Sequence, residues 1–99
     1  MPKVIFQIKY EILPEKREDY MTIMKELKTL VAVKGLESYS VFEQKNKSNN
    51  FEELYIFENQ EAYDEFDDNQ SERVNILMGK LSDLIKENST KYTVLAEVV

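Results

Sequence analysis

An alternating strand that runs straight into a short acidic helix is the feature that most constrains the fold of this chain. It occupies residues 51–69, FEELYIFENQEAYDEFDDN, in which side chains alternate between two faces up to Phe57 and Asn59 then offers a helix N-cap. The residues before this segment show the pattern of one strand–helix–strand unit, and the residues from it onward show the pattern of another. With 99 residues in all, we expect a single domain that spans 1–99.

The first unit is predicted from the spacing of its apolar residues. Residues 3–12 alternate strictly, which predicts a strand with one apolar face and one mixed face. Pro14 suits the first turn of a helix, and apolar side chains at helical spacing extend that helix over residues 14–33. Gly35 can take the left-handed conformation that ends a helix, so a second strand is predicted over 36–44.

The second unit repeats this plan with one additional helix. The polar residues 45–50, KNKSNN, predict a hairpin loop, and a third strand is predicted over 51–58. A short helix follows Asn59, and the apolar residues of the next helix repeat the spacing of the first helix. A final strand rich in β-branched residues is predicted over 90–99. This order, β-α-β-β-α-α-β, predicts an α+β ferredoxin-like fold with a four-stranded antiparallel sheet and helices on one face.

Composition excludes several classes of function. The formal net charge is −6, which argues against binding to nucleic acids or anionic membranes because both need clustered Lys and Arg. The chain has no cysteine, which excludes disulfides and thiolate chemistry, and no histidine, which removes the usual axial ligand of haem and the commonest general base. We therefore expect no metal and no cofactor, and any catalysis must use carboxylates, tyrosines or lysines.

Neither a signal peptide nor a membrane span is expected. The chain starts MPKVIF, which lacks the basic region and long apolar run of a signal peptide. No apolar stretch approaches the roughly 20 residues that a transmembrane helix requires. A cytoplasmic protein is therefore the expectation.

Helices on one side of the sheet leave its other face open. Two such faces packed together would form a homodimer and enlarge the core of a small chain. Lys9 would then pair with a carboxylate of the second subunit, Glu43 or Glu97. The alternative is a monomer with a partly apolar surface. The alternation places six residues on this open face, a set too apolar for a fully solvated surface: Ile5, Gln7, Lys9, Leu54, Ile56 and Leu95.

The segment LYIFENQEAYDEF resembles the strand-to-helix segment of the antibiotic biosynthesis monooxygenase family, part of the dimeric ferredoxin-like α+β barrel superfamily. The resemblance extends over nearly the whole chain, from the lead-in that ends KGLESYSV to the final strand, and rests on the order and spacing of elements. It implies a dimer with a pocket between sheet and helices in each subunit. Phe57 and Phe66 stand where the family often has tryptophan and histidine, and Ile8 stands where haem-degrading members have asparagine.

The alternation also predicts which side chains line that pocket. Glu53 and Tyr55 share the face of Phe57, and Tyr10 lies on the corresponding face of the first strand. These give three candidate catalytic residues: Glu53 could remove a proton from a substrate, and Tyr55 or Tyr10 could stabilise the resulting anion. The candidate substrate-binding residues are apolar or aromatic side chains of the same layer: Phe6, Ile8, Tyr20, Met24, Phe57, Tyr63 and Phe66.

These residues favour a cofactor-independent monooxygenase that acts on a small aromatic or polyketide-like substrate whose own anion reduces oxygen. One alternative is a non-catalytic homodimer that binds a small ligand. Another is an interaction protein in which the same aromatic side chains simply fill the core, as aromatic residues at this spacing usually do.

Acidic residues gather between Glu58 and Glu72, and Asp64, Asp67 and Asp68 share one helical face. A weak cation site is conceivable there. The spacing lacks the Asp/Asn-Gly loop of calcium sites, and acidic residues are common at helix starts. A solvated acidic face is therefore the favoured interpretation.

Overall fold

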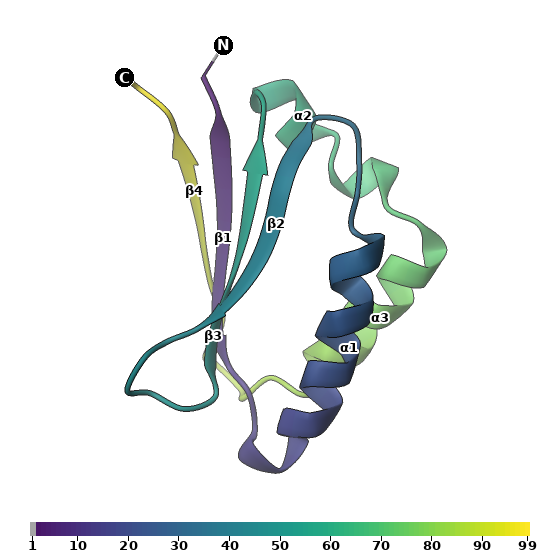
Figure 1. Cartoon of the computed structure of the whole chain (residues 1–99), viewed down its shortest axis with the longest axis vertical. Coiled ribbons are helices and arrows are strands. Elements are labelled where there is room, and N and C mark those ends of the chain that lie inside the picture. The colour runs from purple at the N-terminus through teal and green to yellow at the C-terminus, as the bar shows by residue number, and fades with distance from the viewer. Residues whose placement is uncertain (1) are drawn as a thin grey trace.

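A single antiparallel sheet carries the fold. In the computed structural model, which describes residues 2–99, its strands are β1 (Val4–Glu11), β2 (Leu36–Glu43), β3 (Asn50–Phe57) and β4 (Lys91–Ala96). They lie in the order β2-β3-β1-β4, so β1 and β3 are central and the other two are edges (Figure 1). This is the predicted ferredoxin-like arrangement, and the fold class is confirmed.

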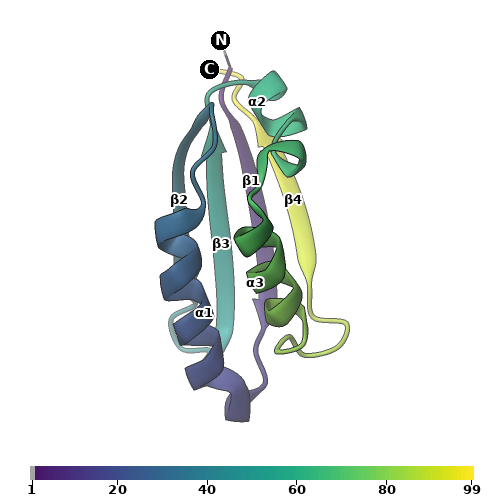
Figure 2. The same ribbon diagram turned by 90° about the vertical axis from the view of Figure 1, so that its right-hand side faces the viewer.

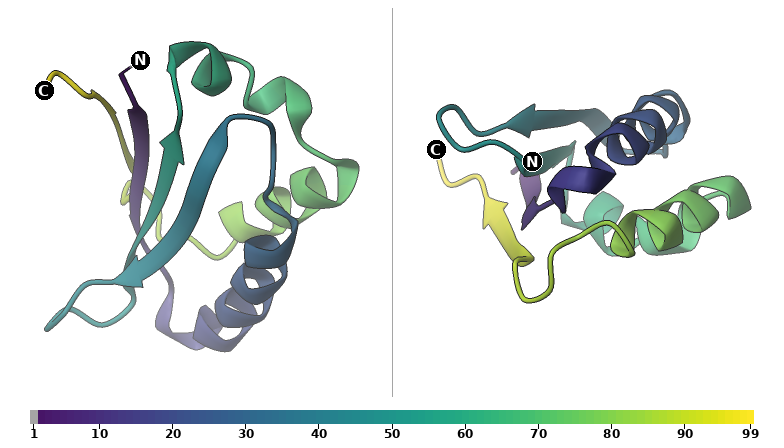
Figure 3. Two further views of the ribbon diagram at one scale, coloured as in Figure 1. Left: turned by 45° about the horizontal axis from the view of Figure 1, so that its top comes forward. Right: turned by 90° about the horizontal axis from the view of Figure 1, so that it is seen from below.

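The helices all lie on one face of this sheet (Figures 1 and 3). The long helices are α1 (Arg17–Leu30) and α3 (Glu72–Ser82), and α2 (Gln60–Asp64) is short. Figure 2 shows α1 in front of β2 and β3 and α3 in front of β1, while most of β4 has no long helix in front of it. Arg73 of α3 and Glu26 of α1 form an ion pair of 2.6 Å that joins the two helices.

The helices differ from the prediction at their ends. The first helix was expected over 14–33, but it begins with the 3-10 turn η1 (Pro14–Lys16) and ends at Leu30, because Val31 has an extended backbone with ψ 97°. Asn59 caps α2 as predicted, since its side chain accepts a hydrogen bond of 2.8 Å from the N–H of Ala62. A second 3-10 turn, η2 (Asp67–Asn69), precedes α3, whose N-cap is Ser71.

Gly35 takes the predicted left-handed conformation between α1 and β2, with φ +86°. A Cβ atom at this position would overlap the Cβ of Ala62 in α2. The glycine therefore serves two purposes, because it turns the chain and it lets α2 pack against the start of β2. The backbone N–H of Glu58 donates to the carbonyl of Gly35 at 2.8 Å and fixes this corner.

The core lies between the sheet and the helices. Strand β3 alternates strictly, with Phe51, Glu53, Tyr55 and Phe57 buried under the helices and the residues between them only half-buried on the other face. The helical spacing of apolar residues predicted the buried faces of α1 and α3. The remaining buried side chains come mainly from β1, from these two helices and from the residues just after them: Val4, Tyr10, Ile12, Tyr20, Met24, Leu27, Val74, Leu77, Leu81 and Leu84.

The open face carries the six residues predicted for it. Ile5 pairs with Ile56 on one side and with Leu95 on the other, and Gln7 pairs with Leu54, so these side chains form one continuous patch. Leu95 is 49% exposed, and Phe42 of β2 adds an aromatic ring that is 55% exposed. None of the helices in residues 2–99 combines the length and apolar character that crossing a bilayer needs.

Candidate functional site

A buried carboxylate at the centre of β3 is the most unusual polar feature of the core. Glu53 is only 3% exposed, and its Oε1 atom accepts hydrogen bonds from the hydroxyls of Tyr39 at 2.7 Å and Tyr55 at 2.8 Å. Its Oε2 atom accepts one hydrogen bond, from the hydroxyl of Tyr10 at 2.7 Å. Three charge-assisted hydrogen bonds compensate for burying this group.

A fourth hydroxyl extends the network towards α1. Tyr20 lies on α1, and its oxygen is 2.9 Å from the oxygen of Tyr10. Because the single hydroxyl hydrogen of Tyr10 is directed to Glu53, Tyr20 is the donor in this pair. The result is a continuous hydrogen-bonded chain from Tyr20 through Tyr10 to Glu53.

The tyrosines of this network keep their protons at neutral pH. Burial is the largest cause that raises the pKa of Tyr10, Tyr20, Tyr39 and Tyr55, and the negative charge of Glu53 raises each pKa further. All four are therefore hydrogen-bond donors: Tyr10, Tyr39 and Tyr55 hold the carboxylate of Glu53 in one orientation, and Tyr20 donates to Tyr10.

A small cavity opens beside this network, between the sheet and α3. Its volume is about 180 Å³. Two backbone hydrogen bonds join the segment after α3 to the end of β1 and hold that wall of the cavity in place. The N–H of Leu13 donates to the carbonyl of Leu84 at 3.0 Å, and the N–H of Lys86 donates to the carbonyl of Glu11 at 2.7 Å. The cavity is lined by side chains of all the surrounding elements: Ile8, Tyr10, Glu53, Tyr55, Met78, Leu81, Ser82, Ile85, Thr90 and Tyr92.

Four predicted site residues meet at this cavity. They are the three candidate catalytic residues Glu53, Tyr55 and Tyr10, together with Ile8. The sequence therefore predicted the polar end of the cavity, because period-two alternation fixes which residues of β1 and β3 share a face.

The other predicted residues lie elsewhere in the same layer. Phe57 and Phe66 pack edge to face with ring centres 5.3 Å apart, and Tyr55 meets Phe66 at 5.1 Å. Phe6 is half-buried and contacts the ring of Tyr63 at 5.7 Å. These aromatic rings fill the end of the layer next to α2, so the space in this layer lies further along β1 and β3.

Tyr20 and Met24, also predicted as binding residues, border a different depression. It lies on the outside of α1 against the edge strand β2 and has a volume of about 630 Å³. Its floor is apolar, and its rim carries Arg17, Lys25 and Lys28. Tyr20 therefore stands between the outer depression and the network around Glu53.

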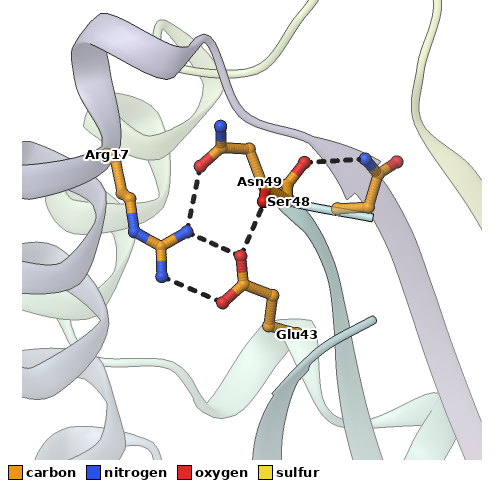
Figure 4. Close-up of polar contacts among 5 residues, drawn as sticks. Arg17, Glu43, Ser48 and Asn49 are labelled. Atoms are coloured by element: carbon orange, nitrogen blue, oxygen red, sulfur yellow. Dashed lines mark hydrogen bonds and ion pairs between the residues drawn. The ribbon is translucent and has the colours of Figure 1, made fainter. Parts of the chain in front are cut away.

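One end of the outer depression is fixed by polar contacts (Figure 4). Arg17 donates to both carboxylate oxygens of Glu43, at 2.6 and 2.9 Å, and to the side-chain oxygen of Asn49 at 2.9 Å. The hydrogen bond from Arg17 and the backbone N–H of Asn49 lower the pKa of Glu43 to about 2. Glu43, expected as a partner of Lys9 across a dimer interface, is thus already paired within its own chain.

The acidic cluster lies on the surface of the molecule. Its members from Glu58 to Glu72 are exposed, and Asp64 accepts a hydrogen bond from Gln60 at 2.9 Å. Within the described part of the chain, no group of three or more acidic side chains is arranged to hold a metal ion. The arrangement agrees with a solvated acidic face.

Tyr39 is the member of the network around Glu53 that the sequence prediction missed. It lies on β2, where a register irregularity between Leu36 and Ser38 breaks the alternation. In the structure Tyr39 is 4% exposed and opposes Tyr55, with ring centres 4.5 Å apart. The alternation of Tyr39 and Val41 was the available signal, but their face follows only from the pairing of β2 with β3.

Comparisons by sequence give no match, either to protein-family models or to curated proteins. Solved structures match well. A conserved protein from Methanosarcina mazei Go1 has a TM-score of 0.84 at 17% identity, covering 99% of this chain and 95% of that one. A variant of SnoaB, a cofactor-independent oxygenase from Streptomyces nogalater, has a TM-score of 0.75 at 11% identity, covering 94% and 90%.

A structure described as an antibiotic biosynthesis monooxygenase also matches, with a TM-score of 0.71 at 19% identity over 100% of this chain and 98% of that one. Each of these identities is below 20%, so the likeness concerns the backbone arrangement. The resemblance inferred from LYIFENQEAYDEF is confirmed at this level. The chain has the fold of the antibiotic biosynthesis monooxygenases.

Proposed function

We propose that this protein is a cofactor-independent monooxygenase that acts on a small aromatic substrate with an acidic hydroxyl. The observation that carries the proposal is the buried carboxylate of Glu53 at the inner end of a 180 Å³ cavity, surrounded by tyrosine donors. The shared fold with a cofactor-independent oxygenase supports the same reaction class, because that fold hosts such chemistry in at least one protein.

In the first step Glu53 takes the hydroxyl proton of the substrate. Oε1 is held by Tyr39 and Tyr55, which leaves Oε2 as the atom that receives the proton. Once Oε2 is protonated it is neutral, and its hydrogen bond from the hydroxyl of Tyr10 is weakened. Tyr10 can then donate that hydrogen to the phenolate oxygen and stabilise the anion.

The electron-rich anion then reduces dioxygen without help from a cofactor. A bond forms between a ring carbon and one oxygen atom, and the O–O bond breaks. For a simple phenol the balance is phenol plus O₂ to quinone plus water, in which the substrate supplies all four electrons. The ring carbon that gains oxygen loses its own proton, and this proton and the one held by Glu53 leave with the second oxygen atom as water, so the carboxylate is restored.

We further propose that the protein works as a homodimer through the open face of the sheet. Support comes from the continuous patch around Ile5, Ile56 and Leu95, on the face of the sheet that the chain's own helices leave uncovered (Figure 1). Covering such a patch stabilises a chain of this size, because apolar area removed from water contributes about 25 cal/mol per Å².

A non-catalytic ligand-binding homodimer is the second candidate function. The observation that favours it is the composition of the cavity: a small cavity with one polar end and apolar walls can select a ligand whether or not a reaction follows. In this case the tyrosines would serve to orient Glu53 for binding alone.

Oxygen consumption separates the two functions. The wild-type protein should consume one O₂ per substrate in an oxygen electrode, and a chelator should leave the rate unchanged. Product analysis should show one oxygen atom added to the ring and no accumulation of hydrogen peroxide. Saturable binding without oxygen uptake would favour the ligand-binding function instead.

A further inference from the structure

The outer depression has the features of a second binding site, separate from the inner cavity. It lies between α1 and the edge strand β2, and its volume of about 630 Å³ is within the range of roughly 300–1,000 Å³ that is usual for small-molecule sites. An apolar molecule can lie on its floor, which is a layer of apolar side chains from α1, β2 and β3: Tyr20, Met21, Met24, Val41 and Phe51.

The floor combines a fixed ring with adjustable side chains. Phe51 is buried, and the guanidinium carbon of Arg17 lies 5.5 Å from the centre of its ring. Met24 is buried beside it, whereas Met21 is 38% exposed to solvent. Methionine side chains adjust to the shape of a ligand because they are unbranched and polarisable. This surface therefore suits a flexible aliphatic chain.

The rim of the outer depression is positively charged, although the whole chain carries a net charge of −6. Lys25 and Lys28 are exposed at this rim, and neither belongs to any of the four ion pairs found among residues 2–99. Glu43 also lines the depression, but Arg17 donates to both of its carboxylate oxygens and neutralises it (Figure 4). The two lysines therefore set the charge that a ligand meets.

The sequence of α1 places these lysines on one face without acidic neighbours. Residues 17, 21, 24, 25 and 28 all line the depression, as expected for one face of a helix with 3.6 residues per turn. No acidic residue lies three or four positions from Lys25 or Lys28. Two like charges three positions apart oppose helix formation slightly. The stability of α1 therefore does not explain the pair, whereas an anion between them would be attracted by both.

Lys28 also favours a small molecule over an extended peptide. Its ammonium group donates a hydrogen bond to the backbone carbonyl of Tyr39, and it lies 5.8 Å from the centre of the Tyr39 ring. A peptide added as a strand would need the backbone groups at the free edge of β2, and Lys28 already occupies one of them. An ammonium group has three hydrogens, so Lys28 can still donate to an anion.

We infer that the outer depression binds a small aliphatic carboxylate. The carboxylate group lies between Lys25 and Lys28, and the aliphatic chain lies over Met21, Met24 and Phe51. Burial of the chain supplies most of the affinity, and the exposed lysines select a negative head group. The site is separate from the inner cavity, and its occupation does not depend on the proposed oxygenase reaction.

The methionine methyl signals of the wild-type protein locate the ligand. Met21 and Met24 line the outer depression, whereas Met78 lines the inner cavity. In nuclear magnetic resonance spectra of protein with isotope-labelled methionine methyl groups, octanoate should shift the signals of Met21 and Met24 saturably and leave that of Met78 unchanged. A shift of Met78 alone would place the ligand in the inner cavity and overturn the inference, as would the absence of any saturable shift.

Three probes of equal chain length test the head group. Calorimetric titrations should show that octanoate binds about threefold or more tightly than octanol, and that octylamine binds most weakly, as expected from exposed ion pairs. Added salt should reduce the advantage of octanoate over octanol, because it screens exposed charges. Octanol or octylamine that binds as tightly as octanoate would overturn the inference.

Lys25→Glu and Lys80→Glu are a matched pair of variants. Both replace an exposed helical lysine and change the net charge equally, but Lys80 lies on α3 and does not line the depression. Lys25→Glu should weaken octanoate binding about fivefold or more, since one attraction is replaced by a repulsion. Lys80→Glu should keep the wild-type affinity, and octanol should bind both variants equally. Equal octanoate affinities of the two variants would overturn the placement.

Two further measurements test other occupants of the outer depression. An acidic peptide of alternating valine and glutamate that shifts the Met21 and Met24 signals at lower concentration than octanoate would assign the depression to strand addition and overturn the inference. Light scattering in which Lys25→Glu, but not Lys80→Glu, loses a subunit would assign it to a second copy of the chain, with the same consequence. We expect neither result.

Discussion

The hydroxyl of Tyr39 donates a hydrogen bond of 2.7 Å to Oε1 of Glu53, across two neighbouring strands. This bond and the one from Tyr55 occupy Oε1 and leave Oε2 facing Tyr10. The edge strand β2 therefore helps to determine which oxygen atom of the carboxylate faces Tyr10. The orientation of Glu53 depends on a residue that does not line the cavity itself.

Removing this hydroxyl should weaken both the fold and the site. We expect Tyr39→Phe to lower the free energy of unfolding by about 1–3 kcal/mol, because a hydrogen bond to a buried charged group is lost. Urea unfolding measures the change. Tyr92→Phe is the control, since Tyr92 is 68% exposed and its variant should retain wild-type stability. Equal stability of the two variants would mean that the bond contributes nothing.

The four tyrosines of the network should control stability at high pH. Burial raises the pKa of each of them above the ordinary value of 10.0. A group whose pKa is raised by folding contributes its full stability below its unfolded pKa, and that stability is lost as the pH rises above it. Stability should therefore fall steeply above about pH 10, the ordinary tyrosine pKa.

Ultraviolet titration at the tyrosinate absorption band checks this expectation. Four of the six tyrosines should ionise together with unfolding and not before it. The circular dichroism of the native fold should disappear over the same pH interval. Independent ionisation of all tyrosines in a folded protein would contradict the buried network.

The two glycines should respond in opposite directions to alanine. Gly35→Ala should destabilise the protein, because φ is +86° there and the new methyl group would overlap Ala62. Gly79→Ala in α3 should stabilise it by up to about 1 kcal/mol, since alanine favours helices and nothing lies within 4 Å of the new methyl group. Thermal unfolding of both variants measures the effects. A loss of stability in Gly79→Ala would show that this glycine has another role.

The proposed homodimer predicts the effect of a charge on the open face. Ile56→Lys places an ammonium group in the apolar patch opposite Ile5 and should shift the protein from dimer to monomer. Light scattering measures the mass. Ile76→Lys on the exposed face of α3 is the control and should remain dimeric. A wild-type protein that scatters as a monomer would contradict the assembly.

The sequence predicted most of the fold because its signals are local. The alternation in β3 placed Glu53 and Tyr55 under the helices, and the helical stripes of α1 and α3 identified their buried faces. Helix ends were less accurate: α1 stops at Leu30 although Val31 continues the apolar spacing. That end is set by the extended connection to Gly35, which lies under α2.

Sequence periodicity could not predict all the residues of the site, because some of them meet only through contacts between strands and helices. Tyr39 reaches Glu53 only because the hairpin pairs Val41 with Glu53 and Tyr39 with Tyr55. Likewise, alternation placed Phe57 and Phe66 in the same layer as Glu53, but only packing decides that these two rings fill space while the cavity opens near Ile8.

Glu53 is proposed to be the base of an oxygenase, and the oxygen uptake of two neighbouring variants tests this role most directly. Glu53→Gln keeps the shape of the side chain but removes the base, whereas Glu52→Gln makes the same change on the opposite face, where Glu52 accepts a bond of 3.1 Å from Gln7. With a small phenol at saturation, Glu53→Gln should lose about 100-fold or more in rate, as expected for a general base, and Glu52→Gln should keep the wild-type rate. Equal rates in the two folded variants would contradict the account.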